Sequence, residues 1–160
     1  MSAKPLLPLF AALSLAACGS SSQPNNVVTP PTDAGFIDCT NDPRVSQYAP
    51  NLSVKSATGD LVYILLSSTP APPAAETNVF SIKITDGSGV AQPNITGTTV
   101  VPFMPDMGHG TSIVPSMTSN GDGTYSVQPL YLFMAGIWSI TFTPASNIND
   151  TAAFFFCVEG

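Results

Sequence analysis

Two segments of the chain alternate strictly between apolar and polar residues, at positions 79–85 and 138–143. Because successive side chains of a strand point to opposite faces, a period of two indicates a β-strand with one buried face. We expect both segments to face one core, with Trp138 as a core residue and ligand stacking as the alternative role. The apolar positions are Phe80, Ile82 and Ile84 in the first segment and Trp138, Ile140 and Phe142 in the second.

Other short apolar segments are bounded by turn residues, which favours strands there as well. Proline-rich residues 69–73 and glycine-rich residues 86–89 and 119–123 separate them, and the chain has 16 prolines and 12 glycines. No stretch shows convincing helical periodicity. About seven strands are therefore expected, in an all-β antiparallel sandwich. The additional strand candidates are residues 61–66, 98–103, 113–114, 125–127 and 152–158.

The N-terminus has the layout of a secretory signal. Lys4 precedes an apolar stretch at residues 6–15, and the sequence Leu-Ala-Ala-Cys ends at Cys18. This ending resembles the bacterial lipobox, in which a peptidase cuts before a cysteine that carries diacylglycerol. The resemblance implies a signal peptide at residues 1–17 that is removed and a mature chain anchored to the membrane through lipid on Cys18. The apolar stretch is shorter than the roughly 20 residues of a membrane-spanning helix, and a buried helix of the fold is the alternative.

After Cys18 the chain is rich in Ser, Pro and Asn up to about Thr32, which is typical of a flexible tether. We assign residues 18–35 to the lipidated cysteine and linker, and residues 36–160 to a single folded domain. Gly19 after the cysteine resembles the pattern that sorts lipoproteins to the outer membrane of enteric bacteria. The expected location is the cell envelope, on the outer membrane facing the periplasm.

The charge balance excludes two classes of partner. The formal net charge is −6, and the mature chain keeps only Arg44, Lys55 and Lys83 against ten acidic residues. Nucleic acids are not expected as partners, because their binding depends on basic side chains that neutralise phosphates. Electrostatic docking on anionic lipid is disfavoured for the same reason, so the membrane attachment is assigned to the acyl chains.

Two cysteines remain once Cys18 is lipidated. Cys39 and Cys157 form an even pair in an oxidising compartment, which predicts a disulfide between the start of the domain and its last strand. A redox or metal-binding pair is the alternative, although neither cysteine lies in a C-x-x-C motif. No nucleophile elbow, phosphate-binding loop or dinucleotide fingerprint is present, and His109 is the only histidine. We therefore expect a protein that is not an enzyme.

The segment around His109 is unusual for its soft ligands. Met104, Met107 and His109 lie within six positions, and Met117 and Met134 follow. Thioethers and an imidazole suit Cu(I), which accepts few ligands. The candidate copper site is Met104, Met107 and His109, completed by Met134 or Met117. The alternative is that the methionines fill the core and His109 is a structural histidine in a loop.

Three motifs in order resemble the YtkA-like/FixH-like domain over residues 62–156. They are the sequence M-P-D-M-G-H-G at 104–110, G-T-Y at 123–125, and F-M-A-G-I-W-S-I at 133–140. The resemblance implies an immunoglobulin-like sandwich and a link to cation pumps or copper delivery to oxidases. FixH-like proteins carry a transmembrane anchor, whereas this chain has a lipobox, so a direct part in oxidase assembly is not implied.

Two functions are consistent with these features. The first is a lipid-anchored, non-enzymatic binding module that binds copper through the Met/His loop. The second is a structural or protein-interaction module of the envelope without a metal, in which the same loop is a packed corner. Convergence of His109 and at least two methionine sulfurs on one accessible point would favour the first.

Overall fold

The computed structural model describes residues 39–160. The predicted signal peptide at 1–17, the lipidation site Cys18, the linker at 18–35 and the first residues of the predicted domain lie outside the described residues. Within residues 39–160 there is no helix of the length and apolarity that a membrane span requires.

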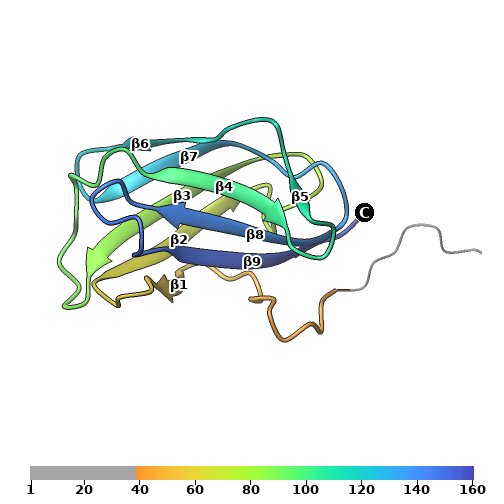
Figure 1. Ribbon diagram of the computed structural model, residues 1–160, viewed down its shortest axis with the longest axis horizontal. Helices are drawn as coiled ribbons and strands as arrows, with labels where there is room; N and C mark the ends of the chain where they lie inside the picture. Colours follow the sequence, from red (N-terminus) through yellow and green to blue (C-terminus); the bar gives the residue numbers. More distant parts are fainter. Residues whose placement is uncertain (1–38) are drawn as a thin grey trace, which may run out of the picture. The chain divides into compact units, whose positions relative to one another are not determined.

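The described residues form two antiparallel sheets (Figure 1). The five-stranded sheet has the order β1-β2-β3-β7-β6, and the four-stranded sheet has the order β5-β4-β8-β9. The all-β sandwich predicted from the sequence is therefore confirmed. The strands are β1 (Leu52–Lys55), β2 (Leu61–Thr69), β3 (Thr77–Asp86), β4 (Thr99–Met104), β5 (His109–Gly110), β6 (Ser116–Ser119), β7 (Thr124–Tyr131), β8 (Gly136–Thr143) and β9 (Ala152–Val158).

Both alternating segments form strands, β3 and β8, and their apolar faces meet in one core. The six predicted side chains are all fully buried and belong to the same hydrophobic cluster. Aromatic rings connect the two sheets across it: Phe80 of β3 packs edge-on against Phe156 of β9, with ring centroids 5.8 Å apart. Trp138 is a core residue, and its indole N–H donates to the carbonyl of Met134 at 2.9 Å.

The predicted strand at residues 113–114 is wrong. Ile113 and Val114 lie in the connection between β5 and β6, where Val114 is 78% exposed. The strand that pairs with β7 in this region is β6, whose sequence Ser-Met-Thr-Ser is mostly polar and exposed. Because β6 is an edge strand, it needs little apolar surface. Together with the short strands β1 and β5, which the sequence did not predict, this gives nine strands in residues 39–160 instead of about seven.

The predicted disulfide is confirmed. Cys39 and Cys157 are bonded, with their Cα atoms 5.3 Å apart, within the range that a disulfide requires. The bond attaches the first described residue to Cys157, the last residue but one of β9. Residues 39–44, which we call the strap, are therefore fixed to the end of the sandwich where the chain also terminates (Figure 1).

Candidate functional site

Within residues 39–160, every residue of the predicted site except Met117 lies at one end of the sandwich, which we call the Cys39 end. It is formed by the strap, the β2–β3 loop (70–76), the β4–β5 turn (105–108), the β7–β8 loop (132–135) and residues 159–160. Figure 1 shows the β4–β5 turn and the C-terminus at this same end. Strand pairing produces this grouping, since β4, β7 and β9 all end here while β8 begins here.

The β4–β5 turn sets the directions of three candidate ligands. Met104 and His109 are direct register partners, so their side chains lie on the same face. Met104 is 1% exposed and belongs to the core, whereas Met107 lies in the turn and is 50% exposed. Gly108 closes the turn with φ +69°, a backbone conformation that favours glycine, and its N–H donates to the Met104 carbonyl at 2.9 Å.

His109 is held by an aromatic neighbour. Its ring stacks on Phe133 with centroids 5.7 Å apart and planes 21° from parallel. Phe133 also stacks on Tyr131 at 5.9 Å and meets Trp138 edge-on at 5.5 Å. We call Tyr131, Phe133 and His109 the aromatic stack. Phe133 is 40% exposed and Tyr131 is similarly exposed, so the stack joins the buried Trp138 to the surface.

The two remaining methionines differ in their relation to this corner. Met134 follows Phe133 directly and packs, partly buried, against the core. Met117 lies in β6 opposite Val127, outside the loops of the Cys39 end. Among residues 39–160, no group of three or more His, Cys, Asp or Glu side chains is placed to hold a metal ion. An ion at this corner would therefore depend on thioether sulfur.

The strap is joined to the β4–β5 turn by an ion-pair network that the sequence did not predict. Arg44 donates to Asp42 at 2.8 Å and 2.9 Å and to both carboxylate oxygens of Asp106 at 2.6 Å and 2.9 Å. Hydrogen bonds from Arg44 lower the pKa of Asp42 to about 2 and also lower the pKa of Asp106. The pKa of Arg44 is raised by the same contacts.

The strap is attached to the four-stranded sheet at two points. Its disulfide holds it to β9, Arg44 holds it to the turn after β4, and β8 lies between those two strands. Ile137 of β8, the register partner of Cys157, is only 4% exposed.

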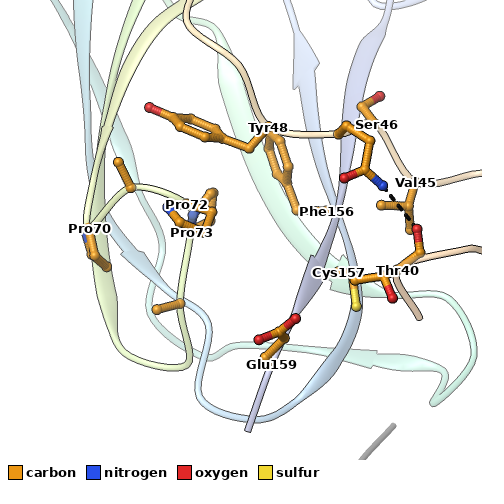
Figure 2. A pocket seen from close by; sticks show the side chains of 13 residues that line it. Thr40, Val45, Ser46, Tyr48, Pro70, Pro72, Pro73, Phe156, Cys157 and Glu159 are labelled. Atoms are coloured by element: carbon orange, nitrogen blue, oxygen red, sulfur yellow. Dashed lines mark hydrogen bonds between the residues drawn. The ribbon is translucent and has the colours of Figure 1, made fainter. Parts of the chain in front are cut away.

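A cavity of about 510 Å³ opens beside the strap (Figure 2). One wall is the proline-rich part of the β2–β3 loop, and the other is the segment from Thr40 to Tyr48. Phe156 and Cys157 of β9 and the carboxylate of Glu159 complete the lining. No sequence pattern indicated this cavity, because its walls come from three separate parts of the chain.

At the opposite end of the sandwich, a buried carboxylate has a structural role. Asp150 is 3% exposed and accepts hydrogen bonds from the backbone N–H and the hydroxyl of Thr58 at 2.9 Å and 2.6 Å. Burial acts to raise the pKa of Asp150, but the hydrogen bonds from Thr58 and Ser56 outweigh it and lower that pKa. Burial, together with the Asp150 charge, raises the pKa of the core residue Tyr63 to about 12.

Comparisons of the chain with protein-family models, with curated proteins and with solved structures found no match. The likeness to the YtkA-like/FixH-like domain therefore depends on the three sequence motifs alone.

Proposed function

We propose that this protein is a lipid-anchored, non-enzymatic binding module of the bacterial cell envelope, attached to the outer membrane and facing the periplasm. The observation that carries the binding role is the aromatic stack, in which Tyr131 and Phe133 expose large ring surfaces above a buried Trp138. Exposed rings supported by a rigid core are typical anchors of protein interfaces, because they bury much area at little cost in side-chain entropy.

One further apolar group lies close to the stack in the chain. Met107, in the β4–β5 turn that leads to His109, is half exposed. The only histidine packs its ring against Phe133. This arrangement supports a contact surface in preference to a catalytic centre built on His109. The partner that fits it is an envelope protein with an apolar patch of its own.

A site-specific photo-crosslinker tests the binding surface in living cells. With the crosslinking residue at Phe133, we expect discrete adducts to one partner. Ile148, which is 71% exposed at the opposite end, is the matched control position. Adducts of equal yield from Phe133 and Ile148, or none from Phe133, would contradict the proposed surface.

The anchor is tested separately through Cys18. Cys18→Ser should leave an uncleaved precursor without lipid, and the variant should be recovered with its signal sequence still present. Normal maturation of the variant and normal recovery of the mature form with the outer membrane would exclude the lipoprotein assignment.

One observation favours a second candidate, binding of Cu(I) at the same corner. The register places Met104 and His109 side by side on one face, and Met134 follows the ring that stacks on His109. Under reducing conditions, His109→Ala and Met107→Leu should weaken Cu(I) binding measured against a competing chelator, while Met117→Leu should not. Equal affinity in all variants would leave the protein-interaction role without a metal.

A further inference from the structure

The cavity beside the strap has a lining that selects for charge. Thirteen described residues line it, and most of them present carbon: Pro70, Pro72 and Pro73 on one wall, and Val45 and Tyr48 on the other. Glu159 carries the only carboxylate among the thirteen. No lysine, arginine or histidine is among the thirteen, so the cavity presents a single negative charge next to apolar surface.

The Tyr48 ring borders the same space, and the ring of Phe156 lies buried next to it. Figure 2 shows the Tyr48 ring extending toward the proline wall, with the Phe156 ring beside it and the Glu159 carboxylate on the far side of the opening. The two rings have centroids 6.5 Å apart and planes at 60°, so they form a corner. Tyr48 is fixed there because its hydroxyl accepts a hydrogen bond from the Ser68 N–H of β2 at 3.2 Å.

This combination fits one class of ligand. A cation is attracted to the faces of aromatic rings and to a carboxylate, and an organic ammonium ion also has carbon groups that pack against proline and valine. An anion would meet Glu159 without a compensating basic group. A volume of about 510 Å³ lies within the usual range of small-molecule sites.

We propose that the cavity formed by Tyr48, the Pro70–Pro73 loop, Phe156 and Glu159 binds a small organic ammonium ion. The cationic head lies between the Tyr48 ring and the Glu159 carboxylate, and the apolar body lies along the proline wall. This site is separate from the aromatic stack, and it does not depend on the partner or the copper proposed above.

The probe is choline, added to the purified full-length chain at low ionic strength and followed by NMR. Its neutral isostere, 3,3-dimethyl-1-butanol, has the same shape without the charge. We expect saturable shifts of amides that line the cavity, including Gln47 and Ala71, and about fivefold weaker binding of the isostere. Benzyltrimethylammonium should bind more tightly than choline, because its ring fills more of the apolar wall.

Glu159→Gln tests the carboxylate and should weaken choline binding about fivefold, a magnitude appropriate to an exposed charge pair. Glu76→Gln is the matched control. Glu76 lies in the β2–β3 loop, whose proline-rich part forms one wall, but its side chain is exposed and does not line the cavity. Tyr48→Leu, which removes the ring, should weaken binding more than Tyr48→Phe, which keeps the ring and loses only the hydroxyl.

Three results would overturn the proposal: no saturable shifts with either cation, equal affinity for choline and its isostere, or equal affinity of the wild type and Glu159→Gln. If Tyr48→Leu fails to fold, its NMR spectrum will show this. The comparison of Glu159→Gln with its control Glu76→Gln then still decides the outcome.

Discussion

The disulfide between Cys39 and Cys157 is expected to contribute a large part of the stability of this domain. The two cysteines are separated by 118 positions, so the bond closes almost the whole domain into one loop. On the chain-entropy relation, a loop of that length loses about 16 cal/mol/K in the unfolded state, or about 5 kcal/mol at 25 °C. Measured values for native disulfides are commonly about 2–5 kcal/mol. We therefore expect Cys39→Ala/Cys157→Ala to lower the free energy of unfolding by about 2–5 kcal/mol.

Denaturant unfolding of the double variant, compared with the oxidised and the reduced wild type, measures this loss. The reduced wild type should match the variant. Amide exchange adds a local readout, because the Ser46 N–H donates to the Phe155 carbonyl at 2.9 Å just beyond the strap and should exchange faster without the bond. A loss below about 1 kcal/mol with unchanged exchange at Ser46 would show that other contacts already fix the strap, and would refute the entropic argument.

Trp138→Ala should lower the free energy of unfolding by about 3–5 kcal/mol in denaturant titrations, because the side chain is fully buried in the core. Arg44→Gln should reduce the loss of stability that the protein shows on acidification. Asp42 and Asp106, whose pKa values Arg44 lowers, stabilise the fold above the unfolded-state pKa near 4, and this contribution is lost as the pH falls toward about 2. Lys55→Gln, with the same charge change, should leave that pH profile as in the wild type. Tyr63→Phe should flatten the loss of stability between about pH 10 and 12, where the raised pKa keeps the folded state protonated while the unfolded state ionises.

The main features of the fold could be predicted because they are written locally in the sequence. A period of two identified β3 and β8 directly, since burial of alternate residues is what a half-buried strand requires. Residues 113–114 misled for a related reason: they are apolar, but two residues carry no period, and Val114 is exposed in a connection. The true neighbour of β7 is polar because it forms an edge.

The candidate site could be predicted only in part. Met104, Met107 and His109 lie together because they are close in sequence, but their directions depend on register. Met104, the register partner of His109, points into the core, whereas Met107 lies in the exposed turn. The stacking of His109 on Phe133 joins β5 to the β7–β8 loop, a contact that no local pattern indicates.

Tertiary contacts across long separations were beyond the sequence. The ion pair of Arg44 with Asp106 spans 62 positions, and no spacing rule relates the two residues. The cavity likewise combines the segment before β1, a loop after β2 and the end of β9. The composition is nevertheless relevant to the cavity. The chain has only four Lys and Arg residues, and none of those within residues 39–160 lines the cavity beside Glu159.

The position of the disulfide relates these features to one another. Cys39 is bonded to the end of β9, so whatever precedes it joins the sandwich at the Cys39 end. The aromatic stack, the Met/His turn and the cavity are at that same end, while Asp60, Asp86 and Asp122 lie at the other. If Cys18 carries the lipid, the length of the linker sets how far this end stands from the membrane. Partners of the stack and ligands of the cavity would then meet the protein on its tethered side, within the reach of that linker.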